Sequence, residues 1–219
     1  MQGDSTGHDM TVTLSRRPIR VVAYLFAAVL TLASCGMKTA SLPRLDAQAI
    51  VLAFGDSLTF GTGAPLDESY PMHLGRAIKR TVVPFGVPGE ISDLGRMRLE
   101  AVLEEVKPAL LLLCHGGNDI LQKRDETALA NNLRAMIQAA RKRNIAVVLI
   151  GVPKPGLWLS TASVYETVAK DMNVPLEGKA LASILGDNRL KADHVHPNSQ
   201  GYAKLAGEIA KLLRERGAI

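Results

Sequence analysis

The amino-acid sequence predicts a three-layer α/β/α fold, in which helices cover both faces of a parallel β-sheet. Two observations lead to this fold class. From residue 50 onward, continuous apolar runs alternate with amphipathic stretches. The apolar runs also lack the every-second-residue alternation of a half-exposed strand, as is typical of parallel strands that are buried on both faces. A chain of 219 residues is long enough for one such domain with a small appendage.

Four segments are candidate strands. Three are continuous apolar runs at residues 50–54, 109–114 and 145–152, and a shorter candidate lies at 81–83. Helices between them are expected to connect the strands by right-handed crossovers. In open sheets of this kind, ligands bind beyond the carboxyl ends of the strands, so the residues that follow each run are the first candidates for a site.

Five segments have the spacing of helices that are apolar on one face. They span residues 72–79, 91–106, 126–143, 162–172 and 198–216. The second of them ends before Pro108 and the last is followed by Gly217, and both residue types are common just after a helix end.

The first 34 residues are predicted to be a signal peptide rather than part of the domain. A basic segment, 16–20, precedes about 13 apolar residues, 21–33, and small residues follow. The apolar run is too short to span a bilayer comfortably. The order of basic, apolar and small residues is that of a secretion signal. Met10 is an alternative start of the chain.

The sequence Leu32-Ala33-Ser34-Cys35 resembles the lipobox of bacterial lipoproteins. The resemblance implies that Cys35 is lipidated and becomes the first mature residue. Residues 35–49 are then the lipidated cysteine and its tether, and residues 50–219 are the folded domain. Such a protein lies in the bacterial cell envelope, anchored to a membrane and facing the periplasm or the exterior. The alternative is an ordinary signal peptide in which the cysteine occurs by chance.

Charge and cysteine content exclude some classes of protein. The net charge is +5, and the basic residues are not clustered in the folded part, so we expect no nucleic-acid partner. Cys114 ends an apolar run and is predicted to be a small buried side chain. Because Cys35 has its own explanation, no disulfide is predicted.

Three motifs stand where strands end or where the last helix begins. They are Gly55-Asp56-Ser57-Leu58, Gly116-Gly117-Asn118-Asp119 and Asp193-His194-Val195-His196-Pro197. Each alone has an ordinary explanation, as a turn, a helix N-terminus or a surface pair. The three together, in this order, are not expected by chance.

With these motifs, the sequence from about residue 50 to about residue 213 resembles the SGNH or GDSL hydrolase family. The resemblance is closest to its branch of small bacterial arylesterases, lysophospholipases and acyl thioesterases. It implies a flavodoxin-like parallel sheet of about five strands. It also implies a serine esterase that hydrolyses carboxylic ester and thioester bonds through an acyl-Ser57 intermediate.

The four signature residues of the family fall on Ser57, Gly89, Asn118 and His196, with Asp193 as the acid of an Asp-x-x-His-Pro motif. A serine hydroxyl is a poor nucleophile without an adjacent base. His196 is assigned as that base, and Asp193 as the residue that fixes its tautomer and orientation. The oxyanion hole is assigned to the backbone N–H groups of Ser57 and Gly89 and to the side-chain amide of Asn118.

Two of these assignments have rivals. His194 is a rival base, but Lys191 rather than an acid lies three residues before it, and no proline follows it. Gly86 is the alternative to Gly89.

Other polar residues in the motifs are expected to support the site. We expect Asp56 to bond neighbouring backbone and Asp119 to cap or brace its loop. His115 stands where relatives usually carry an apolar residue, and it either faces the site or packs.

The chain departs from the family pattern in two further places. The block that relatives tend to write Asn-Ala-Gly-Val-Ser-Gly-Asp is residues 84–90 here, and Pro84 and Pro88 each remove a backbone donor. The loop is therefore expected to differ in shape. The region 152–174 is also short. It contains Trp158, which either lines the acyl groove, touches the bilayer or packs over the sheet.

No metal or organic cofactor is implied. The expected partners are a small acyl ester or a lysophospholipid as substrate, and a membrane through the lipid at Cys35. The alternative functions are a carbohydrate O-acetylesterase of the cell envelope and a non-catalytic envelope binding lipoprotein.

Overall fold

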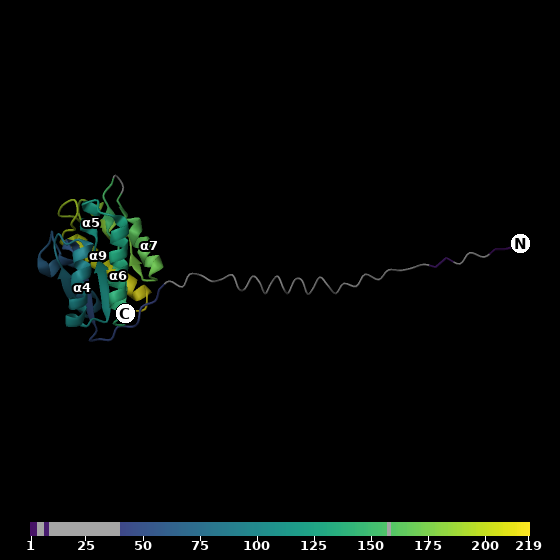
Figure 1. Ribbon diagram of the computed structural model, residues 1–219, viewed down its shortest axis with the longest axis horizontal. Coiled ribbons are helices and arrows are strands. Elements are labelled where there is room, and N and C mark those ends of the chain that lie inside the picture. The colour runs from purple at the N-terminus through teal and green to yellow at the C-terminus, as the bar shows by residue number, and fades with distance from the viewer. Residues whose placement is uncertain (4–6, 9–39, 157–158) are drawn as a thin grey trace. The chain divides into compact units, whose positions relative to one another are not determined.

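A computed structural model of the chain describes residues 1–3, 7–8, 40–156 and 159–219. Most of the expected signal peptide, together with Cys35 and Trp158, lies outside the described residues. Residues from 40 onward belong to one unit, which extends to Ile219 (Figure 1). Within the described residues, no helix has the length and apolar character needed to cross a membrane.

The sheet has five parallel strands in the order β2-β1-β3-β4-β7. These strands are β1 (Ile50–Gly55), β2 (Thr81–Gly86), β3 (Leu110–Cys114), β4 (Ala146–Ile150) and β7 (Leu176–Glu177). The predicted fold class is therefore confirmed. Four of the strands lie where the apolar runs predicted them, and β7 had been expected only by number.

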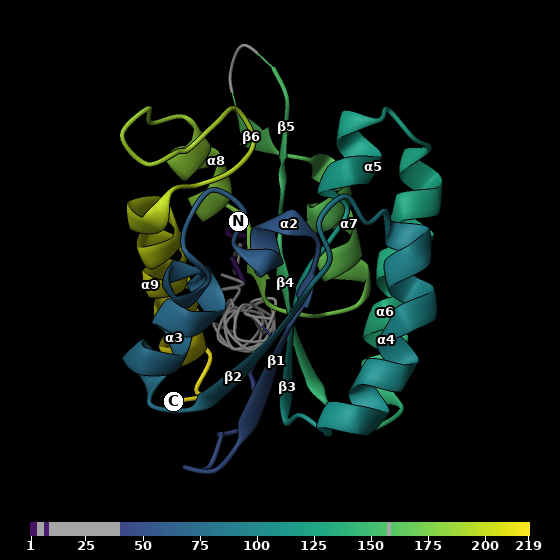
Figure 2. The same cartoon turned by 90° about the vertical axis from the view of Figure 1, so that its left-hand side faces the viewer.

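Helices cover both faces of the sheet (Figure 2). α3 and α9 pack together on one face, with α8 beside α9, and α4, α6 and α7 cover the other. Their bounds are α3 (Tyr70–Ile78), α4 (Ser92–Val106), α6 (Glu126–Arg141), α7 (Ser163–Asp171), α8 (Ala180–Leu185) and α9 (Ser199–Glu215). The shorter elements are α2 (Ser57–Phe60), a 3₁₀ turn η1 (Leu66–Glu68), α5 (Gly117–Leu121) and an antiparallel pair, β5 (Pro153–Lys154) and β6 (Ser160–Thr161).

The core lies where the sheet meets these two helical layers. Every residue of β3 is buried, including Cys114 as predicted, and so are the residues of β1 from Val51 onward. This two-sided burial is the physical reason for the unbroken apolar runs in the sequence.

Strand β2 is longer than the sequence predicted, because it continues through Pro84 to Gly86. It is the first strand in the sheet order and pairs only with β1. An edge strand tolerates a proline, since the missing N–H can face away from the neighbouring strand. Pro84 therefore belongs to the sheet rather than to an altered loop.

The chain joins the domain earlier than predicted. Leu42 and Leu45 are buried in the core, and their backbone N–H groups donate to the carbonyls of Arg216 (2.9 Å) and Ala218 (2.8 Å). The expected tether at 35–49 is thus too long at its C-terminal end. Two leucines in a polar segment form no periodic pattern, so the sequence did not indicate this contact.

Candidate active site

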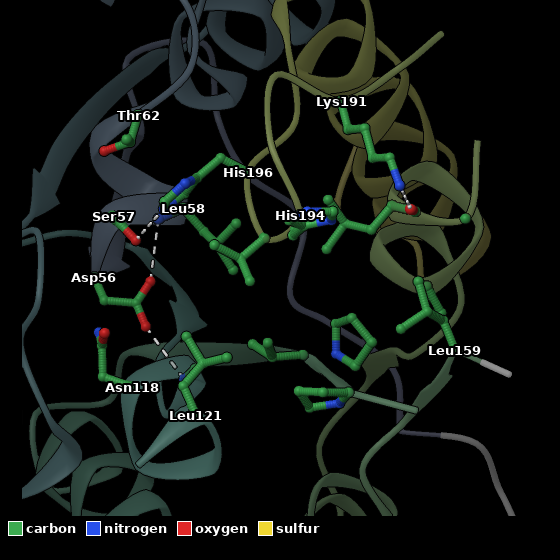
Figure 3. A pocket seen from close by; sticks show the side chains of 18 of the residues that line it. Asp56, Ser57, Leu58, Thr62, Asn118, Leu121, Leu159, Lys191, His194 and His196 are labelled. Carbon is green, nitrogen blue, oxygen red and sulfur yellow. Dashed lines mark hydrogen bonds between the residues drawn. The ribbon is translucent and has the colours of Figure 1, made fainter. Parts of the chain in front are cut away.

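The three motifs meet at the carboxyl edge of the sheet. Ser57 opens α2 directly after β1, and Asn118 lies in α5 directly after β3. The loop with Asp193 and His196 precedes α9. Residues from three distant parts of the chain therefore line one groove (Figure 3).

Ser57, His196 and Asp193 form a continuous hydrogen-bonded chain. The Ser57 hydroxyl Oγ is 2.9 Å from His196 Nε2, and His196 Nδ1 is 2.8 Å from Asp193 Oδ2. A carboxylate can only accept, so the proton between ring and acid lies on Nδ1. Nε2 is then free to accept the Ser57 hydroxyl proton.

Asp193 holds both the ring and the backbone of its own loop. Its Oδ1 accepts from the backbone N–H groups of Val195 and His196, each at 2.8 Å. Burial acts to raise the pKa of Asp193, but the bonds from His196 and from these N–H groups outweigh it and lower the pKa. Asp193 is therefore ionised at neutral pH, and the exposure of half of its side chain also favours the charged form.

The rival base lies elsewhere. His194 is exposed and lines the groove at some distance from Ser57 (Figure 3), whereas His196 makes the bond to the hydroxyl. The structure thus brings together Ser57, His196 and Asp193, and leaves His194 on the wall of the groove without a bond to the Ser57 hydroxyl among the described contacts.

Asp56 ties the serine turn to the neighbouring strand end, as expected of a residue that bonds backbone. Its Oδ1 accepts from the N–H of Leu58 at 3.1 Å and its Oδ2 from the N–H of Gly117 at 3.2 Å. Burial raises the pKa of Asp56, and the nearby His115 and these two N–H groups oppose the rise.

Gly89 and Asn118 face the same groove as Ser57. Gly89 has φ +80°, and a Cβ there would meet nothing within 4 Å. Its rival, Gly86, backs onto α2, where a Cβ would lie 2.1 Å from the Phe60 nitrogen. Gly89 is therefore the better placed donor.

The Asn118 amide has one fixed partner. Its Nδ2 donates to the Glu90 carbonyl at 2.9 Å. An amide nitrogen carries two hydrogens, so one remains for a ligand in the groove.

Asp119 braces the loop, as predicted. Its carboxylate accepts from the Ser92 backbone N–H at 2.8 Å and from the Ser92 hydroxyl at 2.6 Å. These bonds tie α5 to the N-terminus of α4.

His115 does not face the groove. Its side chain is fully buried against Gly95 of α4, and its Nε2 lies 3.0 Å from Glu90 Oε2. Arg98 completes the cluster by donating hydrogen bonds to both carboxylate oxygens of Glu90, at 2.9 and 2.7 Å. Sequence reasoning missed this cluster, because Glu90 and Arg98 resemble ordinary charges of a helix and its approach.

The groove has a volume of about 1260 Å³. Apolar side chains form one part of its wall, and polar residues of the segment before α9 form another. The apolar part of the wall includes Leu121, Val152, Pro153, Pro155, Leu159 and Leu185. Among the residues that the structure describes, no three His, Cys, Asp or Glu side chains gather as metal ligands.

Comparison with known proteins finds a matching family and similar hydrolases. A model of the GDSL-like lipase/acylhydrolase family matches residues 53–204. The chain is 27% identical over 179 residues to thioesterase 1/protease 1/lysophospholipase L1 of Escherichia coli strain K12, which covers 78% of this chain and 86% of that protein. It is 29% identical over 184 residues to esterase TesA of Pseudomonas aeruginosa, covering 79% and 92%.

A solved structure has the same architecture. The crystal structure of TesA superposes with a TM-score of 0.69 at 27% identity, covering 76% of this chain and 99% of that one. The unit described above is therefore shared nearly whole with this relative.

Proposed function

Because the chain belongs to the GDSL-like lipase/acylhydrolase family and is an ester hydrolase, we propose that Ser57 is its nucleophile. The reaction is hydrolysis of carboxylic esters and thioesters through an acyl-Ser57 intermediate. The observation that carries this proposal is the chain of short contacts from Ser57 through His196 to Asp193. The family membership and these contacts argue against a non-catalytic binding lipoprotein.

In the first half of the reaction, His196 Nε2 takes the hydroxyl proton while Ser57 Oγ attacks the substrate carbonyl carbon. Asp193 stabilises the imidazolium that forms. The tetrahedral oxyanion binds the backbone N–H of Ser57, the N–H of Gly89 and the free amide hydrogen of Asn118. Ser57 opens a helix, where backbone N–H groups have no helical partner and are available to an anion.

The intermediate then collapses. The C–O or C–S bond to the leaving group breaks, and His196 returns its proton to the departing alcohol or thiol. In the second half, His196 removes a proton from water, which attacks the acyl carbon. Ser57 Oγ leaves with the proton, and the acid product is released.

The groove supports substrates with more than an acetyl group. Its volume of about 1260 Å³ exceeds the roughly 300–1,000 Å³ usual for small-molecule sites. The apolar wall formed by residues such as Val152, Leu159 and Leu185 suits an acyl chain. We therefore favour an arylesterase, lysophospholipase or thioesterase-like substrate over an acetylated sugar, whose small acyl group would leave this wall unused.

The test measures hydrolysis of p-nitrophenyl esters from acetate to decanoate. Ser57→Ala is expected to lower kcat by about 10³-fold or more with the fold intact. Ser183→Ala is the matched control, since Ser183 also lines the groove and has no bond to His196; it should keep its activity within about threefold. A Ser57→Ala enzyme with a tenth of the wild-type kcat would refute the assignment.

Two further readouts narrow the proposal. A serine-directed phosphonate should label Ser57 alone, as seen by peptide mass. A kcat/KM that rises with acyl length supports a substrate whose acyl chain lies along the apolar wall of the groove. A strict preference for acetate supports the carbohydrate O-acetylesterase instead.

We also propose that Cys35 is lipidated and anchors the enzyme in the bacterial cell envelope, facing the periplasm or the exterior. The lipobox-like sequence before Cys35 supports this. The chain joins the domain at Leu42, beside the end of α9. That helix starts next to the site and runs 17 residues, or about 25 Å, so the chain joins the domain at the end of α9 remote from the groove.

Cellular fractionation tests this anchor. The wild-type protein should sediment with membranes, and mass spectrometry should find a lipid-modified N-terminal Cys35. The Cys35→Ala variant should lose the modification and leave the membrane fraction. An unmodified wild-type protein cleaved elsewhere would contradict the proposal.

A further inference from the structure

We propose that Glu90 is a positioning residue for the oxyanion hole. Its carboxylate is held by Arg98 and His115, and its backbone carries the fixed geometry to Gly89 and Asn118. The inference rests on the proposed function, because those two residues are its proposed oxyanion donors.

The Glu90 carboxylate is buried and bound on both oxygens. Oε1 accepts from Arg98 Nε at 2.9 Å, and Oε2 accepts from Arg98 Nη2 at 2.7 Å and lies 3.0 Å from His115 Nε2. The Arg98 guanidinium in turn lies 4.1 Å from the centre of the Phe54 ring. Two parallel bonds to one guanidinium fix the plane of a carboxylate as well as its position.

This carboxylate is ionised in the folded protein. Burial acts to raise the pKa of Glu90, but the hydrogen bonds from His115 and Arg98 outweigh it and bring the pKa to about 2. Glu90, Arg98 and His115 together form a clamp, and its carboxylate is therefore charged at any pH at which an esterase of this kind is assayed.

His115 is the second side chain that holds the Glu90 carboxylate. It lies between the end of β3 and the glycine pair that precedes Asn118. Its backbone carbonyl accepts from the Tyr165 hydroxyl at 2.9 Å. Its Nδ1 is buried without a partner among the described residues, so the bond to Glu90 is the one polar contact of the ring. Burying the unpaired Nδ1 costs free energy, and loss of the bond to Glu90 would leave the ring without a polar contact among the described residues.

The backbone of Glu90 positions both proposed donors, Asn118 and Gly89. Its carbonyl accepts the Asn118 amide at 2.9 Å, and its N–H donates to the Val87 carbonyl at 3.1 Å, which closes the turn that carries Gly89. Gly89 itself has open space on its side-chain face. The turn is thus held through Glu90, and an oxyanion hole stabilises the transition state only if its donors are held in place beforehand.

The direct test is Glu90→Gln, which keeps the shape and removes the charge. We expect kcat to fall by about 10–100-fold while KM stays within about threefold, because the lost alignment matters mainly in the transition state. Glu104→Gln is the matched control. Glu104 lies in α4, the helix that carries Arg98, and 72% of its side chain is exposed. Its substitution should leave both kcat and KM unchanged.

An inhibitor separates positioning from general damage. A trifluoromethyl ketone forms a reversible tetrahedral adduct with a serine nucleophile and places an oxyanion in the hole. Its inhibition constant should rise in Glu90→Gln by the same factor by which kcat/KM falls. In the Asn118→Ala background, Glu90→Gln should cost less than it does in the wild type, since the part of its effect that acts through Asn118 is already lost and only the part that acts through Gly89 remains.

His115 provides an independent pair of variants. His115→Leu restores an apolar residue and loses the bond, and kcat should fall by about tenfold. His115→Gln retains an N–H near the Nε2 position and should recover part of the loss. If Glu90→Gln does not fold, this pair decides the question.

The inference is overturned if folded Glu90→Gln keeps its kcat within twofold of the wild-type value, or if the substitution changes KM rather than kcat. It is also overturned if His115→Leu has the kcat of the wild type. Its failure is distinct from that of the proposed function. An active Ser57→Ala enzyme refutes the proposed function, whereas an inactive Ser57→Ala with an unimpaired Glu90→Gln refutes this inference alone.

Discussion

Gly95→Ala is expected to destabilise the protein although it replaces glycine by alanine within a helix. Gly95 lies in the first turn of α4 and faces the buried His115 ring. Helix propensity alone favours alanine over glycine by up to about 1 kcal/mol. The structure opposes this gain at Gly95.

A Cβ on residue 95 would lie 2.2 Å from His115 Nε2 and 2.7 Å from its Cδ2. The ring must therefore move by roughly 1 Å to restore contacts of about 3.5 Å. It is fully buried and bonded to Glu90, so the move strains the core by about 1–3 kcal/mol. It also breaks a bond to a charged group, worth about 1.5–3 kcal/mol. Less the propensity gain of up to about 1 kcal/mol, we expect a net loss of about 1.5–5 kcal/mol.

Urea unfolding of Gly95→Ala measures this loss, and Gly207→Ala is the matched control. Gly207 is an exposed glycine within α9, where a Cβ would meet nothing within 4 Å. That variant should be more stable than wild type by up to about 1 kcal/mol. In a His115→Ala background, Gly95→Ala should lose most of its cost, because the clashing ring is gone and the two sites are coupled.

The same variant links packing to catalysis. If the Glu90–His115 bond positions the oxyanion hole, kcat of Gly95→Ala should fall about tenfold at temperatures where the protein is fully folded. A Gly95→Ala enzyme that is stabilised as much as Gly207→Ala, with unchanged kcat, would refute the reasoning about both the clash and the clamp.

Two further predictions concern the proposed catalytic groups. His196→Ala should be nearly as damaging as Ser57→Ala and the double variant little worse than either, because residues that act as one unit are not additive, whereas His194→Ala should cost under about tenfold; steady-state kinetics that rank the two histidines in the reverse order would show that the base is wrongly assigned. Asn118→Ala should lower kcat by about 10²–10³-fold with little change in KM, since its bond to the oxyanion forms in the transition state, and a change confined to KM would place Asn118 in substrate binding instead.

Much of the fold could be predicted from the sequence because its strands are buried on both faces. The unbroken runs that became β1, β3 and β4 need no tertiary information to be recognised. Strand β7 could not be found this way, since it is only Leu176–Glu177 and exists through pairing with β4. Helix α8 has six residues and is too short for a helical period to stand out.

The site residues also divide into those that the sequence could locate and those that it could not. Ser57, Asn118 and the Asp193–His196 pair lie in short motifs whose members are adjacent in sequence, so a linear pattern could locate them. Glu90 and its partners could not be located, because Arg98 and His115 come from a helix and a strand end that meet only in the folded chain. The sequence signalled this cluster only through His115, a histidine where relatives usually carry an apolar residue.

Sheet register explains why the nucleophile and the amide donor reach one another. In the pairing of β1 with β3, Gly55 lies opposite Cys114, so the two strands end level with each other. The next residues along, Asp56 and His115, therefore start their turns side by side, and the Asp56 carboxylate can bind Gly117 across the gap. A shift of either strand by one residue would reverse its side chains and separate these turns.

His196 has a different origin. It is placed by a loop whose ends are joined by the bridge between Lys191 and Pro197 and whose interior is tied by Asp193. The proposed oxyanion hole thus depends on the rigid sheet and on the clamp behind it, whereas the base depends on a local turn. Substitutions in the clamp should consequently affect stabilisation of the oxyanion without changing the contact between His196 and Ser57. For that reason, phosphonate labelling of Ser57 in the clamp variants should slow in proportion to kcat/KM and still go to completion.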